Sequence, residues 1–167
     1  MEFIKQYFSA EKSESFLAIV IGTILLSFSI YILIKWGDAF YKGFAVPVVV
    51  VALIQIVVGS VVYFRTDKQV QTLMEQFEVS PTEFAQAENQ RMNIVMKNFS
   101  VYKWIEVAFV VSGLLLIIFF KNKEFVLGVG VGLLLQGALM LSADIFAERR
   151  GNLYLKSVDK IMNDKNV

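Results

Sequence analysis

The stretch that decides the fold is residues 80–121, SPTEFAQAENQRMNIVMKNFSVYKWIEVAFVVSGLLLIIFFK. It opens with Ser80-Pro81, a helix-start pattern in which serine caps the helix and proline occupies its first turn. Polar sequence then passes into the apolar run 104–120 with no glycine or proline at the crossing. One helix over this stretch is roughly 60 Å long at about 1.5 Å per residue, and a bilayer core is only about 30 Å thick. We therefore expect a helix that is half in a membrane and half in water.

The composition also indicates a membrane protein. Hydrophobic residues make up 56% of the 167 residues, which is more than an ordinary soluble domain carries. They are gathered in four blocks that are long enough for membrane spans and are separated by most of the charge. These blocks, which we interpret as four transmembrane helices, are residues 16–36, 44–64, 104–120 and 125–147.

The segment between the second and third spans, residues 65–103, continues the helical pattern outside the membrane. Val70, Leu73 and Phe77 recur at helical spacing and form an apolar stripe. A turn at Pro81 divides the segment into two helices. The predicted fold is therefore all-α: a polytopic membrane protein with a four-transmembrane-helix antiparallel bundle, in which helices 2 and 3 extend into a cytoplasmic helical hairpin.

The two ends of the chain are shorter amphipathic segments. Residues 1–15 carry apolar side chains at helical spacing among charges, so they are either an interfacial amphipathic helix or a frayed terminus. Residues 148–167 keep helical spacing through Tyr154 and Val158, which predicts a helix or tail that can join the hairpin. Gly151 is the expected weak point of that helix.

Lysine and arginine counts predict the orientation. The N-terminus, hairpin and C-terminal tail hold twelve of these residues: Lys5, Lys12, Arg65, Lys68, Arg91, Lys97, Lys103, Arg149, Arg150, Lys156, Lys160 and Lys165. The two short loops between spans hold four: Lys35, Lys42, Lys121 and Lys123. Because basic residues stay on the cytoplasmic side, we expect a multi-pass integral membrane protein with both termini in the cytoplasm, in a bacterial inner membrane.

Several function classes are excluded or disfavoured by composition. The chain has no cysteine and no histidine, which removes disulfides, thiol chemistry, the usual zinc sites and histidine-based catalysis. We find no phosphate-binding loop or other catalytic motif, and we predict no cofactor. The net charge of +1 gives no reason to expect nucleic acid as a partner.

Acidic residues enter the predicted spans at one depth. Glu106 begins the third span and Asp144 ends the fourth, so antiparallel packing places both at the inner membrane face. Intramembrane acids need partners, and we expect a cluster of these two with Arg65, Glu148 and Arg149. The cluster is either a salt-bridge belt that fixes helix depth or a site for an ion or lipid headgroup. A hard cation such as Mg²⁺ is the metal that carboxylates suit.

Two further pairs of polar residues share a depth or a helix face. Gln55 and Gln136 fall near the midpoints of their spans and can bond each other across the bundle, as packing contacts or as a permeation point. In the hairpin, Glu88 and Arg91 are three residues apart, a spacing that favours a local ion pair.

Glycines mark two faces of the fourth span. Gly128 and Gly132 form a small-xxx-small pair, and Gly130 and Gly137 lie along another face. Small residues let helices approach closely in membranes. We therefore expect the fourth span to pack tightly on both sides.

These features favour a non-enzymatic anchor or interaction protein that presents a cytoplasmic helical hairpin. Its expected partners are the lipid bilayer and either a protein partner or further copies of itself, bound through the hairpin. The alternatives are an oligomeric small transporter or channel, and a lipid-headgroup or ion-binding membrane enzyme that uses the inner acid cluster.

Overall fold

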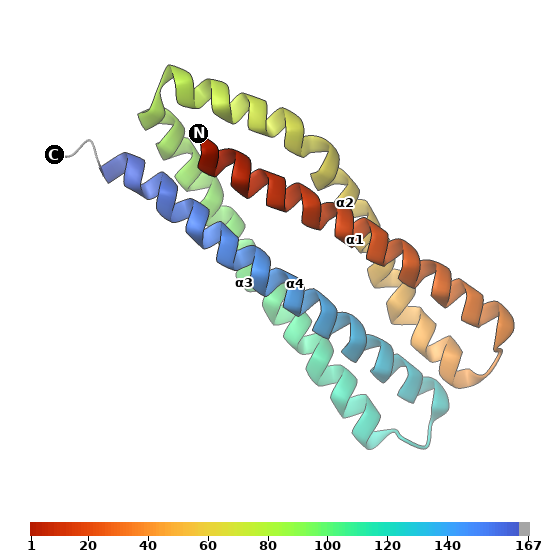
Figure 1. Cartoon of the computed structure of the whole chain (residues 1–167). Helices are drawn as coiled ribbons and strands as arrows, with labels where there is room; N and C mark the ends of the chain where they lie inside the picture. The colour runs from red at the N-terminus through yellow and green to blue at the C-terminus, as the bar shows by residue number, and fades with distance from the viewer. Residues whose placement is uncertain (164–167) are drawn as a thin grey trace.

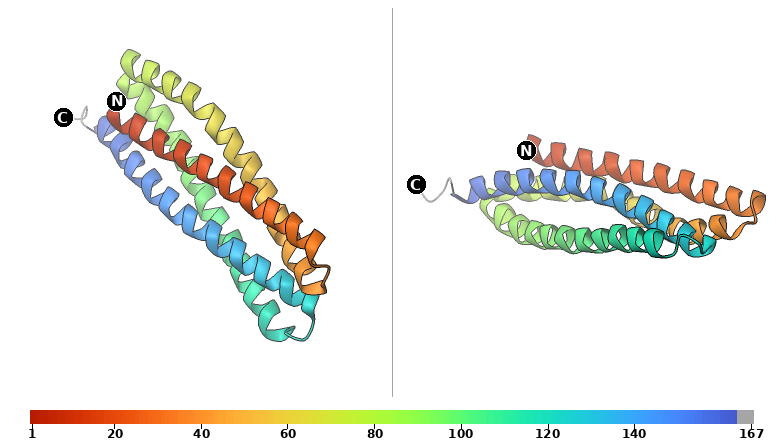
Figure 2. Two further views of the ribbon diagram at one scale, coloured as in Figure 1. Left: turned by 45° about the vertical axis from the view of Figure 1, so that its right-hand side comes forward. Right: turned by 90° about the horizontal axis from the view of Figure 1, so that it is seen from below.

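The computed structural model describes residues 1–163 as four helices that alternate in direction (Figure 1). The helices are α1 (Glu2–Lys35), α2 (Ala39–Val79), α3 (Pro81–Phe119) and α4 (Glu124–Asn163). The N-terminus, the α2–α3 turn and the end of α4 lie at one end of the bundle, and the other two turns lie at the opposite end (Figures 1 and 2). The all-helical fold predicted from the sequence is confirmed.

Every helix is longer than a membrane span. The four helices have 34, 41, 39 and 40 residues, which corresponds to about 50–60 Å at 1.5 Å per residue. All four are long and apolar enough to cross a membrane. We call residues 16–64 and 104–147 the apolar half of the bundle, and residues 1–15, 65–103 and 148–163 the polar half. Each helix continues without a break from the apolar half into the polar half. The segment boundaries predicted from the sequence therefore mark a change of composition along a helix and not the end of a helix.

The break between α2 and α3 has a local cause. Ser80 has an extended backbone and its Oγ accepts a hydrogen bond from the backbone N–H of Glu83, at 3.4 Å. Pro81 follows in the first turn of α3, where a missing N–H is tolerated. The cap and the proline together end one helix and begin the next within a single residue.

Packing is organised around α2 and α4. α1 packs chiefly against α2, and α3 packs chiefly against α4, so that contact between α2 and α4 joins two helix pairs. Seen from below, α1 and α3 lie on opposite sides of α4 (Figure 2). Both glycine faces of α4 are used: Gly128 meets the backbone of Phe40 on α2, and Gly137 meets the backbone of Glu106 on α3. The expected tight packing on two sides of this helix is confirmed.

The polar half differs from the expected hairpin because all four helices contribute to it. α2 and α3 share their core with the start of α1 and the end of α4. The buried residues of this core are Ile4, Tyr7, Phe8, Leu73, Phe84, Ala85, Met92, Tyr154 and Val158. Residues 65–103 are therefore half of a four-helix bundle in which the chain ends supply the other half.

The first residues do not form the interfacial helix or the frayed end considered above. Ile4 and Phe8 are fully buried, and the ring of Phe3 lies 6.1 Å from that of Phe77, near the end of α2. Their apolar surface is already covered by protein, so it is not available to a lipid surface. At the other end of the chain, α4 continues without a break through Gly151, which is buried beside Met96.

The predicted amide pair in the apolar half is not formed. Gln136 is fully buried, and its Nε2 donates to the carbonyl oxygen of Val48 on α2, at 3.4 Å. Gln55 instead packs towards α1, where its Cβ lies 3.4 Å from the position of a Cβ on Gly22. The two glutamines lie at a similar depth but contact different helices. Gln136 on α4 faces α2, whereas Gln55 on α2 faces α1 and not α4.

Candidate functional site

The most completely buried charge in the polar half is the carboxylate of Glu88 on α3, which is only 2% exposed. Arg91, one turn later, donates to it from Nε and Nη2, each at 2.7 Å. Tyr154 on α4 donates its hydroxyl to the same carboxylate at 2.8 Å. The ion pair predicted between Glu88 and Arg91 is present, whereas Tyr154 was not predicted as its third member. We call Glu88, Arg91 and Tyr154 the Glu88 network.

Aromatic rings from α1 close this network. The ring of Tyr7 stacks on that of Tyr154 with centroids 4.4 Å apart. The guanidinium of Arg91 lies 5.5 Å from the ring centroid of Phe8, which is within the range of a cation–π interaction. The network thus links α1, α3 and α4, and side chains of the core cover Glu88 and Tyr154, whereas the side chain of Arg91 is 30% exposed.

Burial fixes the protonation of the two tyrosines. Burial, followed by the charge of Glu11, raises the pKa of Tyr7 to about 12. Burial, followed by the charge and hydrogen bond of Glu88, raises the pKa of Tyr154 well above its usual value. Both phenols therefore keep their protons at physiological pH, and Tyr154 is a permanent hydrogen-bond donor to Glu88. The hydrogen bonds of this network hold α3 and α4 together.

A second set of charges lies where the apolar and polar halves meet, and we call it the boundary belt. Its ion pairs connect helices: Lys12 with Asp67 at 2.6 Å, Arg65 with Glu11 at 3.7 Å, Lys103 with Glu148 at 2.6 Å, and Arg150 with Glu14. Exposed pairs of this kind each contribute about 0–1 kcal/mol to stability. Their value lies in fixing which helix faces which at one depth.

The boundary belt corrects the predicted acid cluster. Arg65 and Glu148 do not join Glu106, because each is bound to a residue that the prediction left out. Arg149 is exposed and makes no ion pair within residues 1–163, whereas Arg150 bonds Glu14. Lys103, Glu11 and Glu14 were missed although Lys103 directly precedes the apolar run 104–120, and Glu11 and Glu14 lie within five residues of the run 16–36, which was the available signal.

Only Glu106 and Asp144 of that cluster come together. Glu106 is 1% exposed, and neither of its carboxylate oxygens has a hydrogen-bond donor. The half-buried carboxyl group of Asp144 on α4 lies within hydrogen-bonding range of it. Within the described part of the chain, no three Asp, Glu, His or Cys side chains are close enough to hold a metal ion. We call these two residues the acid pair.

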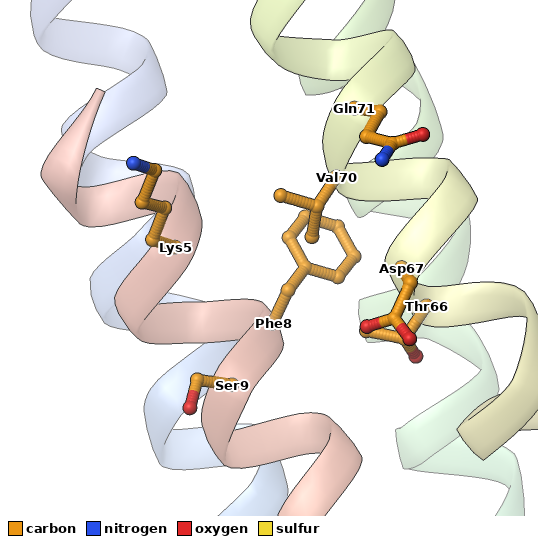
Figure 3. Close-up of a pocket in the computed structure, with 7 residues that line it drawn as sticks. All are labelled: Lys5, Phe8, Ser9, Thr66, Asp67, Val70 and Gln71. Carbon is orange, nitrogen blue, oxygen red and sulfur yellow. The ribbon is translucent and has the colours of Figure 1, made fainter.

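Two cavities lie in the polar half. The first has a volume of about 350 Å³ and lies between α1 and α2. Figure 3 shows Phe8 reaching towards Val70 there, while the polar ends of Lys5 and Ser9 point away from that contact. The second, of about 470 Å³, lies between α2 and α3 beside their turn, and we call it the apex groove. It is lined by Thr72, Glu75, Gln76, Val79, Ser80, Glu83, Phe84 and Ala87.

Glu11 in the boundary belt gives a test of pH dependence. Burial raises the pKa of Glu11 above its usual value, although the charge of Arg65 opposes the shift. The folded protein therefore holds this proton more tightly than the unfolded chain, and the stabilisation is lost as pH rises through the folded pKa. We expect Glu11→Gln to raise the Tm at pH 7 by no more than about 4 °C.

The pH profile of this variant distinguishes the cause. Below the ordinary pKa of 4.5, Glu11 is protonated in both states, so the wild type and Glu11→Gln should unfold at the same temperature there. Thermal unfolding in detergent, followed by circular dichroism from pH 4 to pH 8, measures the difference. A lower Tm for the variant at pH 7 would show instead that the charge of Glu11 is stabilised by Arg65.

No family model matches the chain, and comparison with curated proteins and with solved structures finds no match either.

Proposed function

We propose that the protein is a membrane anchor whose polar half stands in the cytoplasm and binds a partner protein at the apex groove. The observation that carries this proposal is the combination of a rigid four-helix support with an exposed, acidic groove at its far end. The partner that fits is a basic segment with an apolar side chain.

Membrane insertion is supported by what the apolar half exposes. Large side chains such as Ile24, Val57 and Phe119 are 61%, 61% and 73% exposed and point away from the bundle. In water such a surface causes aggregation, and in lipid it is the expected surface. The distribution of twelve basic residues on the polar half and its termini against four on the short loops supports a cytoplasmic polar half.

Rigidity is supported by the packing of the polar half. Three sets of contacts stabilise the polar half along its length. They are the core supplied by all four helices, the Glu88 network and the boundary belt. Residues 65–79 of α2 alone extend roughly 22 Å at about 1.5 Å per residue. A surface at this distance lies beyond lipid headgroups and is accessible to other proteins.

The chemistry of the apex favours a basic partner. Val79 is 86% exposed, and Glu75, Glu78 and Glu83 around it are exposed as well. No lysine or arginine occurs between Lys68 and Arg91. Two copies in one membrane would bring equal negative charges together at this level, which disfavours self-association through the apex. A different chain that offers positive charge and one apolar anchor complements the groove.

Photo-crosslinking in native membranes tests the proposal. A photoreactive residue at position 79 should give one main adduct, and mass spectrometry should find a basic segment at the crosslinked site. The same residue at position 153, where Leu153 is exposed on α4, should not give this adduct. Failure to form an adduct at position 79, or the same adduct at both positions, would contradict a binding site at the apex.

Charge variants give a matched control. Glu75→Gln with Glu83→Gln removes two negative charges from the groove, and we expect it to reduce the adduct at least tenfold. Asn98→Lys with Asn152→Lys changes the net charge by the same amount at exposed positions elsewhere, and it should leave the adduct unchanged. An adduct that contains a second copy of this chain would replace the proposed partner by a homo-oligomer.

The enzyme and transport alternatives receive less support. Glu148, one of the acids that headgroup chemistry would use, is bound to Lys103. Gln55 and Gln136, which a transport path would use together, lie on different faces. We therefore propose neither activity.

A further inference from the structure

We propose that Glu106 and Asp144 form a proton-binding site, in which the two carboxyl groups share one proton and hold α3 against α4. The site is independent of the apex groove and does not rest on the proposed partner. It joins the two helices at the inner edge of the predicted spans. Three features of the molecule point to this site: Glu106 is buried, its oxygens have no hydrogen-bond donor, and neighbouring cations are paired with other carboxylates.

The carboxylate of Glu106 is buried and lacks a hydrogen-bond donor. Glu106 is 1% exposed, so water does not supply hydrogen bonds to it, and neither of its oxygens has a donor in the protein. Asp144 is close enough to hydrogen-bond with Glu106. Two ionised carboxylates are both acceptors, and no hydrogen bond forms between them. One proton on the pair makes one group a donor and the other an acceptor, and it removes one of two adjacent negative charges.

The surrounding charges do not replace this proton. Lys103 on α3 is a neighbouring cation, and its Nζ is bound to Glu148 on α4 at 2.6 Å. Glu14 on α1 also faces Asp144, and its own charge is compensated by Arg150.

On α2, the first charged residue beyond the apolar run is Arg65, which pairs with Glu11. Lys103, Arg150 and Arg65 are therefore each paired with another carboxylate, and the exposed Arg149 makes no ion pair with Glu106 or Asp144.

A metal ion fits less well than a proton. Divalent cations that bind carboxylates require six or more oxygen ligands, several of them usually water. The acid pair offers two side chains, one of them almost completely buried, and no third acidic group completes a set within residues 1–163. A proton needs no further ligand and no space.

Infrared spectroscopy of the purified protein in lipid tests for the proton directly. We expect the wild type at neutral pH to show the C=O band of a protonated carboxyl group in a dry environment. Glu106→Gln and Asp144→Asn should each abolish the band, because the new amide donates to the remaining carboxylate without a titratable proton. The same chemical change at a distant exposed residue, Glu124→Gln, should leave the band unchanged.

Stability against pH provides the second measurement. The folded pair keeps a proton that the carboxyl groups of the unfolded chain lose above about pH 4 to 5. The unfolding equilibrium constant of the wild type should therefore increase by up to about tenfold per pH unit above that pH, until the folded pair loses its proton as well. Glu106→Gln should not show this increase. The absence of a protonated carboxyl band in the folded wild type, a band that persists in both amide variants, or equal pH slopes would each overturn the proposal. A stoichiometric metal ion found by elemental analysis would overturn it in favour of a cation site.

Discussion

Substitution of Gly128 by leucine is expected to separate α4 from α2 and to unfold the bundle at ordinary temperatures. A Cβ at this position would lie 2.0 Å from the carbonyl oxygen of Phe40 and 2.7 Å from the backbone nitrogen of Phe44. These are backbone atoms of a helix and cannot rotate away. Overpacking typically costs about 1–3 kcal/mol and more where nothing can move, so we expect a loss of at least about 3 kcal/mol.

The reciprocal contact predicts the same result from the other helix. A Cβ at Gly43 on α2 would lie 1.9 Å from the carbonyl oxygen of Phe125 on α4. Gly37 is the matched control, because a Cβ there has no heavy atom within 4 Å. Thermal unfolding in detergent should show a large fall in Tm for Gly128→Leu and Gly43→Leu, and no measurable change for Gly37→Ala. Wild-type stability in either leucine variant would mean that α2 and α4 do not approach this closely.

Removal of the carboxylate of Glu88 is expected to have the second-largest effect. Glu88→Ala leaves the hydroxyl of Tyr154 and the guanidinium of Arg91 without their partner. Breaking a buried ion pair from one side costs about 3–5 kcal/mol. Because the side chain of Arg91 is 30% exposed and can turn towards water, we expect about 3 kcal/mol, the lower end of this range.

Hydrogen exchange can locate the damage from this substitution. Protection of α3 in residues 81–95 should fall in Glu88→Ala, whereas the apolar half should keep its protection. Glu75→Ala removes an exposed glutamate and should change stability by less than about 0.5 kcal/mol. Tyr154→Phe should cost less than Glu88→Ala, and the two changes should not add, since they remove the same hydrogen bond. Equal effects of Glu88→Ala and Glu75→Ala would show that the buried network contributes nothing.

Features that depend on one helix could be predicted from the sequence. The long apolar runs gave the four helices, the spacing of Gly128 and Gly137 gave two packing faces, and the three-residue separation gave the Glu88–Arg91 pair. Each of these follows from helix geometry without knowledge of a neighbouring helix.

Features that depend on the rotation of two helices could not be predicted. Neighbouring residues on a helix point about 100° apart, so sequence depth does not distinguish Arg149, which is exposed, from Arg150, which bonds Glu14. The acid pair was found because Glu106 and Asp144 share both depth and facing side. The partner of Glu88 on α4 was missed for the same reason that the partners of Arg65 and Glu148 were missed: each lies on another helix at an unknown rotation.

The stacking of Tyr154 on Tyr7 has a consequence for biosynthesis. One ring belongs to the first turns of the chain and the other to its last helix, and Phe3 also lies against Tyr154, with ring centroids 5.6 Å apart. At about 5–20 residues per second, the ribosome adds the later ring roughly 7 to 30 s after the earlier one. During that interval the aromatic residues at the start of α1 lack their final cover. The core of the polar half can close only after α4 has been synthesised through Tyr154, and chains released before residue 154 would carry an open aromatic surface that quality-control proteases and chaperones recognise.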